Sequence, residues 1–225
     1  MFYIEKDNIV IGTNEDREEF IAILKYRPDL KEEDIKEVPK GYIAIAGKPL
    51  MSKEDYNKEI NQAERNRLNM LSMTRGDMFE ALILSKGITK VQIRAMIENN
   101  PTLDTITRAL YLNRFDEALE FYRGYPIFDL LGGSLDITSD MLDNFFEAKD
   151  YHYLSKYTLE VHPTPSEAVI TINGEITNKV TLPYNTDVKY IVSLDNYVAQ
   201  TGKLNLTENK IIEIELQPET IITQE

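Results

Sequence analysis

Residues 157–216 read YTLEVHPTPSEAVITINGEITNKVTLPYNTDVKYIVSLDNYVAQTGKLNLTENKIIEIEL, with β-branched side chains in alternation along much of the segment. Glycine, proline and asparagine interrupt this alternation about every ten residues, a spacing typical of turns between short strands. The dipeptide Asn173-Gly174 separates two such runs, and Asn-Gly is the strongest short-range signal for a β-hairpin. Roughly six or seven short strands in this length predict an all-β sandwich over residues 157–217.

The residues before this segment have helical periodicity. From Met73 to Ala148, apolar side chains recur at helical spacing, and Gly87 and Pro101 mark stops. We therefore expect a helical domain over residues 51–150. Its helices are expected over residues 52–73, 74–87, 89–100, 102–113, 115–124, 127–135 and 139–150. The expected first residues or N-caps are Ser52, Thr74, Thr89, Thr102 and Thr138 or Ser139.

The first of these helices, residues 52–73, is polar on most of its surface. Ser52 with Asp55 three residues later is an acidic variant of the capping box. A helix this polar either lies solvated on its own domain or packs in an oligomer through a narrow seam. That seam would contain Tyr56, Ile60, Ala63, Leu68 and Leu71.

Residues 1–50 combine strand and helix signals. Two β-prone runs within residues 2–12 flank a polar break, which predicts a hairpin. A helix is expected over residues 14–27, capped by Thr13 or Asn14, and a short strand over residues 42–48.

The chain is thus expected to be an α+β multidomain protein. A helical N-terminal and middle region with short strands precedes the C-terminal all-β sandwich, and the boundary falls near residues 149–157. Residues 218–225 are expected to form a flexible tail.

Charge and composition exclude several classes of function. The 225 residues include 38 acidic and 25 basic side chains, a formal net charge of −13, which disfavours general nucleic-acid binding. The absence of cysteine excludes disulfides, zinc–thiolate sites and a thiol nucleophile, and two histidines argue against a His-rich metal site. We expect no cofactor. Since the chain has neither a signal-peptide pattern nor a long apolar run, we expect a soluble protein without a membrane span.

Residues 73–100 admit two interpretations. A helix-turn-helix would present Lys90, Gln92 and Arg94 to base edges. An αα-hairpin inside a helical core is the simpler interpretation, because no basic flank is present to neutralise phosphates.

The glycine pair in Gly132-Gly133-Ser134 lacks the spacing of a phosphate-binding loop and is interpreted as the end of a helix and a loop. Two acidic clusters have helical spacing and are interpreted as solvated helix faces, with acid–base or cation chemistry as the alternative. They contain Asp140, Asp143 and Glu147, and Asp116, Glu117 and Glu120.

Aromatic residues gather in two places. Tyr151, Tyr153 and Tyr157 lie around the expected domain junction, where they either pack the junction or form a surface for a sugar or a protein. The richest stretch is residues 109–133, where core packing explains most of the rings. Tyrosine and arginine are also favoured at protein interfaces. The interface candidates are Tyr111, Arg114, Phe115, Tyr122, Arg123, Tyr125, Tyr151 and Tyr153.

The segment from Thr158 to Leu216 resembles small PEGA-like or immunoglobulin-like β-domains. The resemblance rests on VHPTPSEAVITINGE, TLPYNTDVKYIVSLDNY and the closing GKLNLT…IIEIEL. The matching positions are Pro165, Ala168, Ile170, Asn173, Gly174, Tyr190, Val192 and Tyr197. Asn185 departs from the pattern, since the family more often has glycine there. The resemblance implies a domain for surface display, adhesion or spacing.

Residues 40–98 are similar to small tail-module proteins of bacteriophages infecting low-GC hosts. The shared pattern is a short strand ending in a Gly-Lys turn, a polar helix, the Leu-x-x-Leu-x-Met-Thr start of the next helix, and paired helices. This resemblance supplies no catalytic residues.

These observations together lead us to expect a non-enzymatic bacteriophage virion protein of the tail or baseplate region. Its helices would dock into the particle and its β-domain would face outward, with host-surface contact as one use. The expected partners are other phage structural proteins and further copies of the chain, in the virion and in the host cytoplasm during assembly. The alternatives are a tail-assembly chaperone that leaves the particle, a small enzyme using carboxylates or tyrosine, and a helix-turn-helix regulator.

Overall fold

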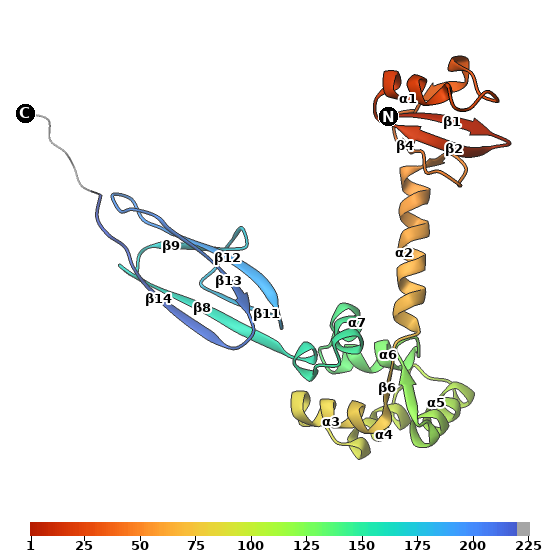
Figure 1. Cartoon of the computed structure of the whole chain (residues 1–225). Coiled ribbons are helices and arrows are strands. Elements are labelled where there is room, and N and C mark those ends of the chain that lie inside the picture. The colour runs from red at the N-terminus through yellow and green to blue at the C-terminus, as the bar shows by residue number, and fades with distance from the viewer. Residues whose placement is uncertain (220–225) are drawn as a thin grey trace, which may run out of the picture. The chain divides into compact units, whose positions relative to one another are not determined.

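The computed structural model describes residues 1–219 (Figure 1) and has mixed α+β architecture. The chain divides into two units, Met1–Arg67 and Leu68–Glu225. The division falls inside helix α2 (Lys53–Asn69), whereas we expected the helical domain to begin just ahead of this helix. Helix α2 therefore contributes residues to both units.

The first unit is a small sheet with short helical segments. The Asp7-Asn8 turn, with φ of 51° and 64°, joins β1 to β2, which confirms the expected hairpin. Helix α1 is capped by Asp16, whose carboxylate accepts from two N–H groups of the first turn, so a cap at Thr13 or Asn14 was wrong. The elements are β1 (Phe2–Lys6), β2 (Ile9–Asn14), α1 (Arg17–Leu24), η1 (Glu32–Asp34), β3 (Ile35–Glu37), β4 (Tyr42–Ile43) and β5 (Met51–Ser52), and the three-stranded sheet has the order β2-β1-β3.

Helix α2 begins where the sequence predicts. The Ser52 hydroxyl accepts from the N–H of Asp55 at 3.0 Å and donates to its carboxylate at 2.7 Å. Most side chains along the middle of the helix are exposed, and Ile60 keeps 47% of its surface. Leu68 is the buried member of the expected seam, so packing through the other positions stays a prediction.

The helical domain, defined as the elements from β6 to η2, follows α2. Thr74, Thr89 and Thr138 cap their helices as predicted, and Gly87 ends α3 with φ of 65°. Asp104 rather than Thr102 caps α5. The elements are β6 (Ser72–Thr74), α3 (Arg75–Lys86), α4 (Lys90–Glu98), α5 (Thr105–Glu117), β7 (Glu120–Tyr122), α6 (Ile127–Ser134), α7 (Ser139–Ala148) and η2 (Tyr151–Leu154).

The helix expected over residues 115–124 was wrong. Helix α5 continues to Glu117, and the chain then forms strand β7, which pairs antiparallel with β6. Phe121 at the centre of β7 is buried among the rings of Phe79, Phe115 and Phe128. Backbone pairing with a distant strand therefore overrides the helical pattern of this segment.

Gly132 lies in the last turn of α6, as the helix-end interpretation predicts. A Cβ atom at this position would lie 2.8 Å from the carbonyl oxygen of Ile137, which follows the helix. The carbonyl of Gly132 also accepts from the N–H groups of Leu135 and Ile137. The glycine thus permits a close turn between α6 and α7.

The β-domain, defined as β8 to β14, contains two sheets that share one hydrophobic core. One sheet has the order β10-β9-β12-β13 and the other β11-β8-β14, in which β14 runs parallel to β8. Asn173 and Gly174 form the hairpin between β9 and β10 as predicted, with φ of 51° and 90°. The strands are β8 (Lys156–Thr164), β9 (Val169–Ile172), β10 (Glu175–Ile176), β11 (Lys179–Pro183), β12 (Thr186–Ser193), β13 (Gln200–Leu206) and β14 (Lys210–Glu215).

The structure also bears on two further expectations, at Asn185 between β11 and β12 and at the residues after β14. Asn185 has φ of 64°, so asparagine meets the left-handed backbone requirement that glycine would otherwise meet. Pro218 pairs with Tyr197, and the N–H of Glu219 donates to the carbonyl of Asn196 at 2.8 Å. Residues 220–225, the remainder of the expected flexible tail, lie outside the described residues.

The contact at Gly132 gives a first prediction. Gly132→Ala is expected to destabilise the helical domain by about 1–3 kcal/mol, because the backbone of Ile137 must move. Nothing lies within 4 Å of a Cβ on Gly133, so Gly133→Ala is expected to stabilise by up to about 1 kcal/mol through helix propensity. Urea unfolding followed by circular dichroism measures both variants, and equal changes of the same sign would contradict the close contact.

Candidate interaction site

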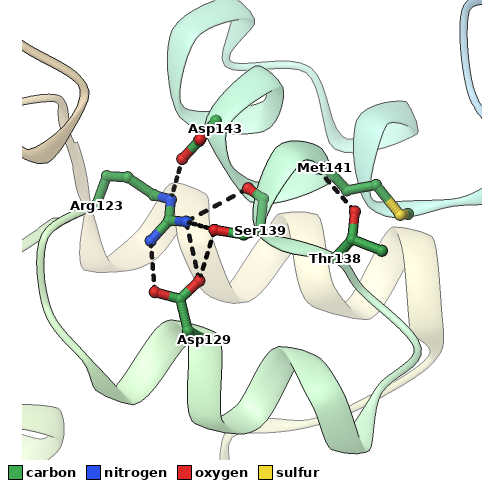
Figure 2. A network of polar contacts seen from close by, with 6 residues as sticks. All are labelled: Arg123, Asp129, Thr138, Ser139, Met141 and Asp143. Atoms are coloured by element: carbon green, nitrogen blue, oxygen red, sulfur yellow. Dashed lines mark hydrogen bonds and ion pairs between the residues drawn. The ribbon is translucent and has the colours of Figure 1, made fainter. Parts of the chain in front are cut away.

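A buried arginine organises the helical domain (Figure 2). Arg123 follows β7 directly and is 1% exposed. Its Nε donates to Asp143 on α7 at 2.6 Å, and its two terminal nitrogens bind Asp129 on α6 at 3.0 and 2.9 Å. Figure 2 shows the guanidinium between the two helices, with Ser139 at 2.6 Å completing its contacts. The network therefore fixes α6 and α7 to the end of β7.

This geometry corrects two expectations. Arg123 could pair either with nearby acids or with a partner; the structure shows the first, and its burial contradicts an interface role. Asp143 is also buried, because it faces this guanidinium, and is not part of a solvated face as we expected. In the other acidic cluster, Asp116 binds Arg94 at 3.1 Å and Lys90 at 3.7 Å.

The remaining candidates in the aromatic stretch separate into buried and accessible groups. Phe115 is buried in the core, edge-on to Phe79 at 5.2 Å, so direct contact with a partner is excluded in this structure. Arg114 is exposed, and its guanidinium lies 4.3 Å from the centre of the Tyr125 ring. Tyr111 and Tyr122 are half-buried. Arg114, Tyr111 and Tyr125 thus remain accessible on one side of the domain.

These three residues separate two hollows. An apolar cavity of about 40 Å³ lies inside the core of the domain and includes Arg114, Tyr111 and Tyr125 in its lining. The same three residues also line a surface hollow of about 410 Å³ at the C-terminal half of α5. The stack of Arg114 on Tyr125 is therefore part of the wall between core and solvent.

The outer face of α5 exposes two apolar side chains. Ile106 and Leu110, one turn apart, are 74% and 63% exposed, and Leu119 just beyond the helix is 79% exposed. These residues were not among the sequence candidates. The sequence feature that could have predicted their exposure is the four-residue spacing of Ile106 and Leu110, which places them on the side of α5 opposite Phe115. A surface helix buries one side and exposes the other.

Helix α5 is held by a strong N-cap. The Asp104 carboxylate accepts from the N–H groups of Ile106 and Thr107, both at 2.9 Å, and from the Thr107 hydroxyl at 2.6 Å. The hydrogen bond from the Thr107 hydroxyl is the largest cause that holds the pKa of Asp104 below its ordinary value of 3.8.

The side chains that would read DNA in a helix-turn-helix are engaged within the chain. Lys90 and Arg94 bind Asp116, and Arg94 also binds Glu98. The Gln92 side chain accepts from the Thr89 N–H at 2.9 Å in a capping box. This arrangement disfavours base reading by these three side chains, and the main helix contact of α4 is with α5.

The tyrosines near residue 150 pack around Tyr184. Tyr153 and Tyr157 meet its ring edge-on at 5.0 and 6.0 Å, and Tyr151 stacks on His152, which stacks on Tyr184. Asn185 donates to the Tyr153 hydroxyl at 3.1 Å, and burial raises the pKa of Tyr157. These contacts join η2 to the turn before β12, as the junction-packing alternative predicts. A partner surface at Tyr151 and Tyr153 stays a prediction.

Two further features concern the described residues 1–219 alone. No three histidine, aspartate or glutamate side chains in this part converge to hold a metal ion. Within the same range, no helix combines the length and apolar character that crossing a membrane requires.

No protein-family model matches the chain, and no solved structure matches it significantly.

The Arg123 network gives a second prediction. Arg123→Met is expected to destabilise the helical domain by about 3–5 kcal/mol, because it removes the cation between two carboxylates while one of them stays buried. Adding Asp143→Leu is expected to recover part of the loss. Arg94→Met, at an exposed pair, is the control and is expected to change urea unfolding little. Equal effects of Arg123→Met and Arg94→Met would contradict the structural role.

The Asp104 cap gives a third prediction. Because its folded pKa is depressed, the charged cap contributes stability that is present above pH 3.8 and lost as the pH falls through the folded pKa. Asp104→Asn keeps a capping oxygen without a titrating charge. We expect thermal melts of the wild type to exceed those of Asp104→Asn near neutral pH and to converge with them below the folded pKa. A difference that is independent of pH would contradict this account.

Proposed function

We propose that the chain is a non-enzymatic structural protein of a bacteriophage particle, in the tail or baseplate region. The phage setting rests on the resemblance of residues 40–98 to tail-module proteins. The observation that carries the binding role is the exposed apolar face of α5, with Ile106, Leu110 and Leu119 beside Arg114. Apolar side chains exposed near one another on a surface favour a protein partner that covers them.

The internal cores support this role. The first unit, the helical domain and the β-domain each have their own cluster of buried apolar residues. The helical domain therefore does not need the α5 face for its own stability. That face is available to dock other structural proteins and further copies of the chain during assembly.

The β-domain is proposed to be a small sandwich of the PEGA-like or immunoglobulin-like kind, facing outward from the particle. Two sheets that share one core support this assignment, as does the left-handed turn at Asn185. Such a domain can serve as a spacer or contact the host surface. The protein would then occupy the virion and, before assembly, the host cytoplasm.

A tail-assembly chaperone is the second candidate, because the same α5 face would suit a transient partner. The two roles differ in whether the protein is present in the finished particle. A helix-turn-helix regulator is less favoured, since Lys90 and Arg94 already bind Asp116.

Particle composition tests the proposal. We expect mass spectrometry of gradient-purified particles to detect peptides of the chain at a constant ratio to the major tail protein. Detection in infected-cell lysate together with absence from particles would favour the chaperone. Absence from both the particle and any tail intermediate would overturn a role in the tail.

A further inference from the structure

The C-terminal half of α5 carries two opposite charges on its outer surface. Arg114 and Glu117 are both exposed and three residues apart, a spacing that places side chains on the same side of a helix. Arg114 stacks on Tyr125, and within residues 1–219 neither charge takes part in an ion pair. Both are therefore available to a partner that presents the opposite charge.

The same region presents a protruding side chain and a surface hollow. Leu119 projects from the chain directly after α5 with 79% of its surface exposed. The 410 Å³ hollow beside it is lined by Leu110, Arg114 and Tyr125, among others, and also by Glu117. A leucine side chain fits a hollow of this size. Within one copy, however, Leu119 leaves most of its own surface in water.

We propose that this face binds a second copy of the chain about a two-fold axis near the C-terminal end of α5. The inference rests on the proposed structural role, whose assembly it specifies. Leu119 of each copy enters the hollow of the other, and Arg114 of each copy pairs with Glu117 of the other. In a two-fold interface each contact occurs twice, because residue i meets residue j and j meets i.

Charge complementarity selects a second copy as the occupant. A two-fold axis between residues 115 and 116 makes the two copies of α5 antiparallel. Position 114 of each copy then lies opposite position 117 of the other. The arginine and the glutamate therefore neutralise each other reciprocally. Leu119 directly follows Ala118, which lines the hollow, so the exposed leucine and the hollow are neighbours in the chain.

A charge-swap series tests the dimer with the full chain. Sedimentation equilibrium is expected to show a reversible dimer of the wild type. Arg114→Glu and Glu117→Arg each place like charges opposite each other twice, and each is expected to weaken the dimer by roughly ten- to a hundredfold. An equimolar mixture of these two variants is expected to recover dimerisation, because the mixed pair restores both attractions.

Two further variants separate packing from charge and from folding. Leu119→Asp removes the protruding side chain and is expected to weaken the dimer at least as much as either charge change. Val91→Asp is the matched control, because Val91 is equally exposed but lies on α4, and it is expected to leave the dimer unchanged. Circular dichroism of each variant establishes that the helical domain is folded.

The outcomes distinguish this inference from the proposed function. A wild type that stays monomeric at high concentration would overturn the dimer, as would a dimer that is indifferent to the charge swaps and to Leu119→Asp. Neither result alters the presence of the chain in particles, which is measured separately. Conversely, the chain could be absent from particles while its dimer responds to the charge swaps as expected. That result would support the dimer interface and overturn the structural role in the particle.

Discussion

The helical domain depends on one buried guanidinium. Arg123 holds two helices through Asp129 and Asp143, with distances of 2.6 to 3.0 Å. Burying a charge is costly unless it is paired and hydrogen-bonded, and removing one partner of such a pair is strongly destabilising. The short strand β7 ends directly before this arginine. The positions of α6 and α7 therefore depend on the pairing of β7 with β6, a strand far away in the sequence.

That dependence explains which parts of the fold the sequence could predict. Caps and turns are local signals, so Thr74, Thr89 and the Asn173-Gly174 hairpin were predicted correctly. Strand β7 was missed because its partner β6 lies about 50 residues earlier, beyond the range of local pattern. The burial of Arg123 was missed for a related reason. Arginine is almost never fully buried unless paired, and both carboxylates come from helices whose packing is not encoded locally.

The candidate site was predicted in part. Arg114, Tyr111 and Tyr125 line one surface hollow, with Arg114 exposed and the two tyrosines half-buried against the core. Leu119 lies within the helix that we expected over residues 115–124. It is exposed instead at a turn of the chain, because α5 ends at Glu117 and strand β7 begins at Glu120. A one-sided helical pattern cannot reveal where a helix stops when the following segment is held by a distant partner.

The parallel pairing of β14 with β8 has a mechanical consequence. These are the first and last strands of the β-domain, and they align from Lys210 opposite Leu159 to Glu215 opposite Thr164. The chain enters at the start of β8 and leaves at the far end of β14. A tensile load applied across the domain therefore acts along both strands in shear, so the hydrogen bonds between them must break together rather than one after another. A domain loaded in this way resists extension more than one whose terminal strands separate one hydrogen bond at a time.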